Sequence, residues 1–323
     1  MNIPVTSPTA VIIDTDPGID DALALMLAFA SPELDVRAVT TVGGNTGLAH
    51  TTDNALRLLH LLQRNDVPVA AGADVPLVRR DSRPDTSTHG EDGFGGVRLD
   101  PSPREADTRS AVQLMIDVID QSAEPLTLIA LGPLTNVAAL IATAPATAAR
   151  LRRIVLMGGG ARLLGNMTPT AEFNIWFDPE AAARVFASAI PVTMVGLDVT
   201  HRALTAPDDW ADLHGGGAVA AAVLGMVDYY TRYHQDRYGT SSTAQHDSLA
   251  VAAVIDPSLI ETTRLAVDVE YVGTLTRGMT VVDVESVGHG DQRTDVALGV
   301  DTARFNQLLV SRIAVLDARI TAQ

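Results

Sequence analysis

The 323-residue chain contains no cysteine and no lysine. Without cysteine it can form no disulfide, no thiolate nucleophile and no cysteine metal site. All 23 basic residues are arginine, which also excludes a Walker-type lysine, a Schiff-base enzyme and a lysine general base. Carboxylates, histidines, amides and hydroxyls are therefore the groups to consider as carriers of any chemistry.

Positive charge and long apolar runs are also scarce. The net charge is −16 and the pI is about 4.7, which argues against nucleic acid and anionic membranes as partners. The longest apolar run, residues 22–30, is too short to span a bilayer. Residues 1–7 have neither a basic region nor a long apolar core, so we expect no signal peptide and a soluble, cytoplasmic protein.

The chain does contain a regular alternation of short β-branched segments with longer segments rich in alanine and leucine. This rhythm predicts an α/β fold with a mostly parallel sheet flanked by helices. The predicted strands are residues 10–13, 36–42, 67–70, 126–131, 153–157 and 191–196, and the predicted helices are residues 20–30, 48–62, 108–122, 134–142 and 179–187.

The alternation breaks after residue 199. From there we expect helices at residues 206–213, 219–238 and 247–254, a β-rich stretch at 264–272 and 279–284, and a closing helix at 302–322. No change in composition marks a linker, so residues 1–323 are predicted to form a single domain with a helical and β-hairpin C-terminal elaboration.

Small, amide and acidic residues follow every predicted strand of the parallel sheet. In open α/β sheets, ligands bind outside the carboxyl ends of the strands, so we expect these residues to gather at one edge. Glycine and asparagine at the start of a loop are often only turn residues, but their recurrence after six strands favours a site. The polar residues in question are Asp14, Asp16, Asn45, His89, Asn136, Asn166, Glu172, Asn174 and Asp198.

The most informative motif is DTDPGIDD, which follows the first predicted strand. Its four carboxylates repel one another, and a hard divalent cation such as Ca²⁺ or Mg²⁺, which takes oxygen ligands, would make the cluster favourable. A helix N-terminus would account for Asp20 and Asp21 but not for Asp14 and Asp16. The motif is not an EF-hand loop, because Leu25 stands where the closing glutamate should be.

Three residues outside this motif are candidates for titratable or metal-binding groups. His246 and Asp247 precede a predicted helix, where an aspartate is usually a cap and a histidine usually structural. Together, however, they offer a metal carboxylate and a titratable group. His89 lies in a glycine-rich loop, where a solvated histidine is the default and ligand binding the alternative.

Residues 165–174 place two amides and a carboxylate around an apolar turn, at Asn166, Glu172 and Asn174. Sugar hydroxyls both donate and accept hydrogen bonds, so amides and carboxylates suit them. The alternative is an ordinary loop with an Asx turn.

Four of the five tyrosines lie within residues 229–238. Tyr230, His234 and Tyr238 share one helix face, at i, i+4 and i+8 spacing. Such a face either packs into a core or stacks on and hydrogen-bonds a flat heterocycle.

Five of these segments resemble the nucleoside hydrolase family of the inosine/uridine-preferring type. They are residues 14–22 (DTDPGIDDA), 41–45 (TVGGN), 132–136 (GPLTN), 165–174 (GNMTPTAEFN) and 246–247 (HD), in the family's order and over most of the chain. The resemblance implies an α/β fold, a tightly held Ca²⁺, and hydrolysis of the N-glycosidic bond of ribonucleosides to free base and ribose.

The resemblance also implies roles for individual residues. It assigns the Ca²⁺ ligands to Asp16, Asp21, Asp247 and the backbone carbonyl of Leu131, where many relatives have threonine. It assigns Asp16 to accept the proton of the attacking water and His246 to act as general acid toward the leaving base. It assigns binding of the ribose hydroxyls to Asp20, Asn45, Asn166, Glu172 and Asn174. It places His89 near the base and the 5′ side of the nucleoside. We expect base preference to depend on Tyr230, His234, Tyr238 and loop 79–98, which do not distinguish purine from pyrimidine.

Three other functions compete with this one. A phosphatase of the haloacid-dehalogenase type also opens with Asp-x-Asp, but it needs a lysine, which the chain lacks. A catalytically silent nucleoside- or Ca²⁺-binding protein would be indicated by loss of Asp16, Asp21 or His246, and all three are present. A hydrolase of another N-ribosyl substrate stays open, because the motifs describe the sugar side and not the base side. Relatives are usually homodimers or homotetramers, so a homo-oligomer is expected.

Overall fold

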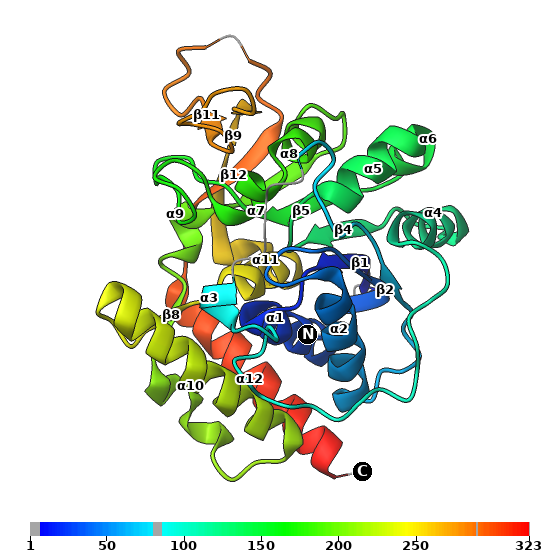
Figure 1. Ribbon diagram of the computed structural model, residues 1–323, viewed down its shortest axis with the longest axis vertical. Helices are drawn as coiled ribbons and strands as arrows, with labels where there is room; N and C mark the ends of the chain where they lie inside the picture. Colours follow the sequence, from blue (N-terminus) through cyan, green and yellow to red (C-terminus); the bar gives the residue numbers. More distant parts are fainter. Residues whose placement is uncertain (1–6, 80–85, 289, 323) are drawn as a thin grey trace, which may run out of the picture.

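Eight strands form one sheet in the part of the chain that the computed structural model describes, residues 7–79, 86–288 and 290–322 (Figure 1). Their order is β3-β2-β1-β4-β5-β6-β12-β9, and every neighbouring pair is parallel except β12 and β9. This confirms the predicted α/β class. The strands are β1 (Thr9–Thr15), β2 (Leu34–Thr41), β3 (Val69–Ala71), β4 (Thr127–Ala130), β5 (Arg153–Met157), β6 (Val192–Val195), β9 (Ile260–Leu265) and β12 (Thr294–Val300).

Two sequence predictions fall partly outside the described residues. Residues 80–85 lie in loop 79–98, which we expect to contribute to base preference. Residues 1–6 make up most of the N-terminal segment 1–7, for which we expect no signal peptide. Among the helices of the described residues, none is long and apolar enough to cross a membrane.

The first strand shows that the sheet is buried on both faces. Val11 and Ile13 belong to one hydrophobic core, and Ile12 between them belongs to a second. This follows from the pleat, which points successive side chains to opposite faces. A strand covered on both faces needs a continuous apolar run, as this one has.

Helices cover the two faces as separate layers (Figure 1). The first core is shared with α1 (Ile19–Ala30), α2 (Leu48–Leu61), α10 (Ala218–Tyr238), α11 (His246–Ile255) and α12 (Thr302–Thr321), and the second with α4 (Ala111–Gln121), α5 (Thr135–Thr143) and α8 (Pro179–Phe186). Helix α1 is buried at every residue from Ile19 to Phe29, because α11 and α12 pack against it. Its first turn therefore removes Asp20 and Asp21 from water.

Several short elements in the connections were not predicted. They are α3 (Thr86–His89), α6 (Pro145–Ala148), α7 (Phe173–Phe177), α9 (Leu197–Thr200), the 3₁₀ helix η2 (Pro257–Leu259) and the strand pair β7 (Leu204–Thr205) and β8 (Thr243–Ala244). One or two turns carry too little periodicity to be recognised in a sequence. The helix predicted at residues 206–213 is instead the 3₁₀ helix η1 (Pro207–Leu213).

The C-terminal part departs most from the prediction. The β-rich stretch predicted at residues 264–272 divides into the end of β9 and a separate strand, β10 (Val267–Val269). Strand β10 pairs with β11 (Thr280–Val282), which confirms the predicted hairpin. Strand β12 was missed: its apolar pattern is interrupted by Asp295 and Gly299, and only pairing with β6 and β9 makes it a strand.

The strand order positions the site. It reverses direction between β1 and β4, which lie side by side at the centre of the sheet. Ligands of such sheets bind at this switch point, outside the carboxyl ends of the strands. The DTDPGIDD motif leaves the end of β1, and Leu131 directly follows the end of β4.

Candidate active site

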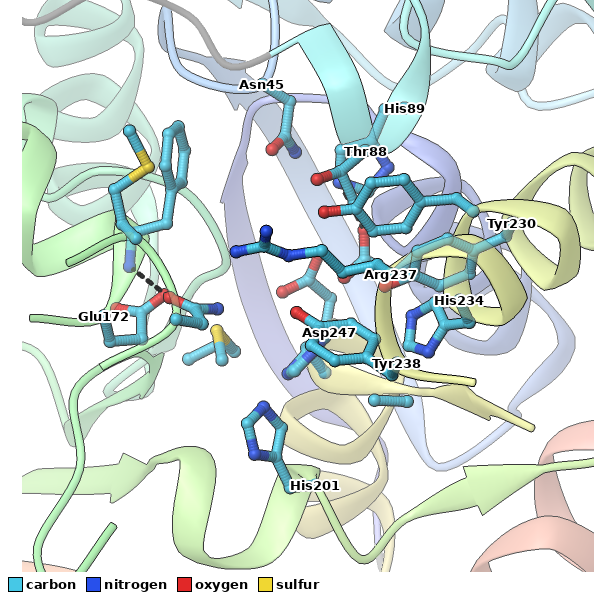
Figure 2. Close-up of a pocket in the computed structure, with 18 of the residues that line it drawn as sticks. Asn45, Thr88, His89, Glu172, His201, Tyr230, His234, Arg237, Tyr238 and Asp247 are labelled. Atoms are coloured by element: carbon cyan, nitrogen blue, oxygen red, sulfur yellow. Dashed lines mark hydrogen bonds and ion pairs between the residues drawn. The ribbon is translucent and has the colours of Figure 1, made fainter. Parts of the chain in front are cut away.

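A cavity of about 670 Å³ opens at the carboxyl edge of the sheet (Figure 2). The residues that the family resemblance gave a role all line it except Asp16 and Asp21, which are buried within the motif. Figure 2 shows Glu172 on one wall, facing His234 and Tyr238 on the other. The predicted lining residues are Asp20, Asn45, His89, Leu131, Asn166, Glu172, Asn174, Tyr230, His234, Tyr238, His246 and Asp247.

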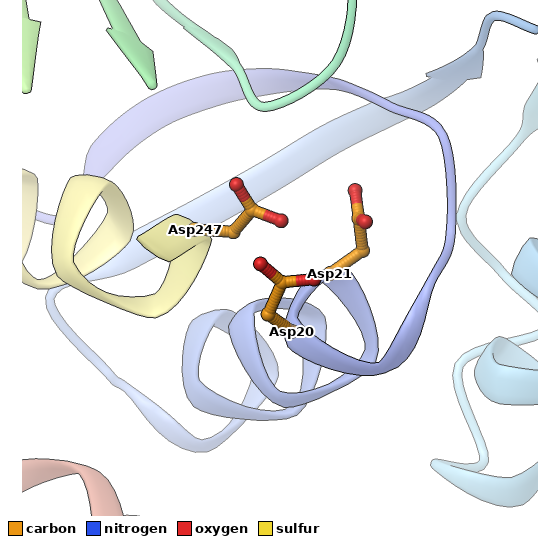
Figure 3. Close-up of side chains that lie close together, drawn as sticks. All are labelled: Asp20, Asp21 and Asp247. Carbon is orange, nitrogen blue, oxygen red and sulfur yellow. The ribbon is translucent and has the colours of Figure 1, made fainter. Parts of the chain in front are cut away.

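Three carboxylates meet at the floor of the cavity (Figure 3). Asp20 and Asp21 project from the first turn of α1, and Asp247 projects from the first turn of α11. One oxygen from each lies within 4.8 Å of the others, and all three residues are buried. Two helix N-termini thus direct their first-turn carboxylates at one point.

Asp16 and Asp21 are held by a network of hydrogen bonds around Asn45. The Asn45 backbone N–H donates to Asp16 Oδ2 at 2.7 Å, and its side-chain amide donates to Asp21 Oδ2 at 3.0 Å. Asp21 also accepts from Thr15 Oγ1 and from the Gly18 N–H. Among the described residues, Asp16 Oδ1 and Asp20 Oδ1 have no hydrogen-bond partner, although both are buried.

Two glycines allow the backbone to approach the Asp16 carboxylate closely. A Cβ at Gly44 would lie 2.1 Å from Asp16 Oδ2, and a Cβ at Gly132 would lie 2.4 Å from Asp16 Oδ1. Any side chain at either position would therefore displace the carboxylate. This gives a physical reason for the glycines in the TVGGN and GPLTN segments.

The electrostatics of the floor favour a cation. Burial raises the pKa of Asp16 and of Asp247 well above the usual aspartate range, and neighbouring carboxylates raise both further. For Asp20, burial raises the pKa to about 6. Buried carboxylates that repel one another, and whose Asp16 Oδ1 has no hydrogen-bond partner among the described residues, fit a hard divalent ion with oxygen ligands. The residues present therefore fit a metal of this class.

The structure brings together part of the predicted ligand set. Carboxylate oxygens of Asp21 and Asp247 lie close to one of Asp20, a residue that we expected to bind the ribose. Asp16 lies next to Asp21, to whose Oδ1 it donates its backbone N–H at 3.2 Å. The Leu131 carbonyl, at the cavity wall, accepts a hydrogen bond from Asn174 Nδ2 at 2.6 Å. The set of Asp16, Asp21, Asp247 and Leu131 stays a prediction.

Asp14, the first carboxylate of the motif, does not line the cavity and binds neighbouring elements of the fold instead. It accepts hydrogen bonds from Thr40 Oγ1 at 2.6 Å and from Asn136 Nδ2 at 2.9 Å. These bonds tie β1 to β2 and to α5. Burial raises the pKa of Asp14 to about 7, against the opposing effect of both hydrogen bonds.

The opposite wall is built around Glu172, which caps α7. Its carboxylate accepts three backbone N–H groups, from Gly159 at 3.0 Å, Asn174 at 3.0 Å and Ile175 at 3.3 Å. Burial outweighs these bonds and raises the pKa of Glu172 to about 7. Asn166 Oδ1 accepts the Phe173 N–H at 3.0 Å. The predicted amide and carboxylate wall is therefore assembled around a single cap.

His246 and His89 are both fixed by partners on other elements. His246 Nδ1 lies 2.8 Å from Thr200 Oγ1, and its ring meets that of His201 edge-on at 5.6 Å. Burial, then the neighbouring imidazoles, lowers the pKa of His246 well below the usual histidine range. His89 is buried, not solvated, and its Nδ1 accepts the Ile19 N–H at 3.1 Å.

The aromatic face of α10 lines the cavity as predicted. The Tyr230 and His234 rings meet edge-on at 4.6 Å, and those of His234 and Tyr238 lie 5.3 Å apart. Tyr230 is buried, whereas Tyr238 is 53% exposed at the cavity mouth. Burial lowers the pKa of His234 to about 4, so its imidazole is uncharged near neutral pH.

Sequence reasoning missed further lining residues, among them the polar side chains of His201, Tyr233 and Arg237. Tyr233 and Arg237 lie on α10, within the segment already singled out for its tyrosines. His201 follows Asp198 by three residues in the turn after β6, and this position was the available signal. Asp198 itself does not line the cavity; it accepts the N–H groups of residues 161–163.

Comparisons with known proteins agree with this geometry. The family model of the inosine-uridine preferring nucleoside hydrolase matches residues 11–307. The pyrimidine-specific ribonucleoside hydrolase RihA of Klebsiella pneumoniae subsp. pneumoniae is 46% identical over 307 residues, which cover 94% of this chain and 98% of that protein. RihA of Escherichia coli is 44% identical over 306 residues, covering 94% and 97%.

Solved structures show the same similarity. The plant nucleoside hydrolase PpNRh1 superposes with a TM-score of 0.90 at 35% identity, covering 95% of this chain and 99% of that one. A purine-preferring ribonucleoside hydrolase from Gardnerella vaginalis superposes with a TM-score of 0.89 at 34% identity, covering 96% and 99%. With the family model spanning nearly the whole chain and relatives above 40% identity, the chain belongs to the inosine-uridine preferring nucleoside hydrolase family and is, as the sequence predicted, a ribonucleoside hydrolase.

Proposed function

We propose that this hydrolase uses Ca²⁺ and that pyrimidine ribonucleosides are its better substrates. The observation that carries the proposal is the arrangement of one cavity: a carboxylate floor, a wall of amides and a carboxylate, and a facing wall of tyrosine and histidine. These three surfaces match a cation, a ribose and a flat base.

The proposed Ca²⁺ ligands are Asp16, Asp21, Asp247 and the Leu131 carbonyl. The orphaned Asp16 Oδ1 and the buried carboxylate cluster support this assignment. The Leu131 carbonyl has a second lone pair beside the one that accepts from Asn174. When bound, Ca²⁺ would orient a water molecule and lower its pKa.

The ribose side of the cavity stabilises charge during cleavage. Breaking an N-ribosyl bond develops oxocarbenium character at the sugar, as in glycoside hydrolysis generally. Preorganised carboxylates and amides favour that positive charge. We assign the ribose hydroxyls to Asp20, Asn45, Asn166, Glu172 and Asn174, and acceptance of the water's proton to Asp16. Attack from the floor with the base leaving opposite predicts inversion at the anomeric carbon.

His246 is placed to protonate the leaving base. Its Nδ1 is engaged by Thr200, which leaves Nε2 as the ring nitrogen available to the base. A neutral imidazole with its proton on Nε2 can still donate it when the Thr200 hydroxyl donates to Nδ1. Tyr230, His234 and Tyr238 would contact the base, and His89 would lie near it and the 5′ side.

Pyrimidine preference is supported by similarity alone. The relatives at 44% to 46% identity are named pyrimidine-specific, whereas the purine-preferring enzyme is only 34% identical. The predicted single domain, the homodimer or homotetramer and the cytoplasmic location stay predictions.

The test is release of free ribose from uridine, cytidine, inosine, adenosine and guanosine, before and after removal of metal with a chelator. We expect faster release from the two pyrimidine nucleosides, loss on chelation and recovery with Ca²⁺. Release that continues without metal would contradict the Ca²⁺ proposal. A faster reaction with purines would contradict the base preference. No release from any nucleoside would shift the function to another N-riboside or to binding without catalysis.

A further inference from the structure

A threonine outside the cavity holds the turn next to Glu172. Thr280, the first residue of β11, is buried and is not among the residues that line the cavity. Its Oγ1 accepts the Gly160 N–H at 2.9 Å and donates to the Gly160 carbonyl at 2.6 Å. One hydroxyl thus pairs with both polar backbone groups of one residue, which requires a side chain that donates and accepts.

The same turn carries a hydrogen-bond donor to Glu172. The Gly159 N–H donates to Glu172 Oε2 at 3.0 Å, and the Gly159 carbonyl accepts from the Leu197 N–H at 2.8 Å. Gly159 has φ of +73°, and a Cβ there would lie 2.7 Å from Thr280 Cγ2. The turn therefore rests directly on Thr280, and a displacement of either moves the donor.

The hairpin that carries Thr280 is also attached on the other side of Glu172. Arg277 Nη2 pairs with both carboxylate oxygens of Glu180 in α8, at 2.7 and 2.8 Å. Thr170 Oγ1 donates to the Leu275 carbonyl at 3.1 Å. The hairpin therefore spans from the turn after β5 to the segment that contains Glu172, and it fixes the two relative to each other.

We propose that Thr280 is a positioning residue for ribose recognition: acting through the turn at residues 158–160, it sets the orientation of the Glu172 carboxylate and hence selectivity for the ribose hydroxyl that Glu172 binds. This inference rests on the proposed role of Glu172. The buried Thr280 hydroxyl holds the turn rigidly. If it were displaced, the N–H and the carbonyl of Gly160 would both lose their hydrogen bond to it, which is costly for buried groups.

The experiment compares Thr280→Val with the matched control Thr280→Ser. Valine keeps the shape and removes the hydroxyl, whereas serine keeps the hydroxyl. For each variant, kcat/KM is measured for uridine and for its 2′-, 3′- and 5′-deoxy analogues. Discrimination is the ratio of kcat/KM for uridine to kcat/KM for a deoxy analogue. Glu172→Ala is measured first, and the analogue whose ratio falls most identifies the hydroxyl that Glu172 binds.

Thr280→Val should lower discrimination against that one analogue by about tenfold, the effect of one well-made hydrogen bond. Discrimination against the other two should change by less than about twofold, and Thr280→Ser should resemble the wild type. In the Glu172→Ala background, Thr280→Val should cause no further loss, because both act through one group. A general loss of folding cannot produce this pattern.

Unchanged discrimination in folded Thr280→Val, or an equal loss at all three hydroxyls, would overturn the inference. If Thr280→Val does not fold, Thr280→Ala is read in its place. Failure of Glu172→Ala to single out one hydroxyl would overturn the inference together with the role of Glu172. Absence of ribose release by the wild type would instead overturn the proposed function, so the failures are distinguishable.

Discussion

Two aspartates of one motif have different roles because of the atoms around them. Asp14 has hydroxyl and amide donors from neighbouring elements and serves to join β1, β2 and α5. Each keeps one buried oxygen without a hydrogen-bond partner among the described residues, Asp14 Oδ2 and Asp16 Oδ1. Asp16, however, is also repelled by the neighbouring carboxylates of Asp21 and Asp20, and a bound cation would relieve that repulsion. Residue type alone does not distinguish these two roles.

His246→Ala tests the proposed acid at the residue scale. We expect ribose release from inosine to fall by roughly 10²- to 10⁴-fold, the usual contribution of a general acid. Hydrolysis of p-nitrophenyl riboside should fall far less, because its leaving group needs no proton. Steady-state kinetics on both substrates would measure the difference, with His214→Ala, a substitution of an exposed histidine, as the control. Equal losses on the two substrates would remove His246 as the acid.

At the scale of elements, α10 forms one wall of the cavity and the hairpin supports the opposite wall. The i, i+4, i+8 spacing of Tyr230, His234 and Tyr238 aligns their rings along one face of the helix, and those rings contact one another in sequence. The hairpin fixes the turn beside Glu172. The width of the cavity therefore depends on two elements that are far apart in the chain.

Tyr238→Ala should change the ratio of pyrimidine to purine turnover. Tyr238 is exposed at the cavity mouth, so its removal should cost little stability, whereas loss of one aromatic contact should change kcat/KM by roughly 3- to 10-fold. Tyr271→Ala is the matched control, because Tyr271 is 48% exposed against 53% for Tyr238 and does not line the cavity. The five-nucleoside panel measures the ratio. An unchanged ratio would place base selection elsewhere.

At the scale of the whole molecule, the fold concentrates negative charge at its centre. The layers on both faces of the sheet bury Asp14, Asp16, Asp21 and Asp247 almost completely. Like charges in this environment oppose folding when ionised. A bound cation offsets that repulsion, so the stability of the entire chain should depend on metal.

Removing metal should lower the melting temperature. Free Ca²⁺ at 100 times its Kd would stabilise the folded state by about 2.7 kcal/mol, which corresponds to roughly 4 °C in a chain of this size. Calorimetry with and without chelator measures the shift. In Asp16→Ala, which is expected to retain neither Ca²⁺ nor activity, the shift should disappear. A wild type that melts at the same temperature with and without Ca²⁺ would rule out this coupling.

Much of the site could be predicted because its residues follow strand ends. The strands from β1 to β6 were recognisable from short apolar runs, and their carboxyl ends brought Asn45, Leu131 and Glu172 to one edge. Thr280 could not be predicted in this way. It belongs to no local pattern, and it acquires its neighbours only when distant segments pack.

The sequence by itself determined the α/β class, the family, and the identity of the groups around the cavity, because periodicity and strand-end position are local properties. Only the tertiary structure decided that Asp20 joins Asp21 and Asp247, that Asp14 is tied to neighbouring elements, and that β12 and β9 complete the sheet. These depend on which side chains burial brings within a few ångströms. Pairings between residues more than a hundred positions apart, such as Asn136 with Asp14 and Thr280 with Gly160, exist only after the chain has folded.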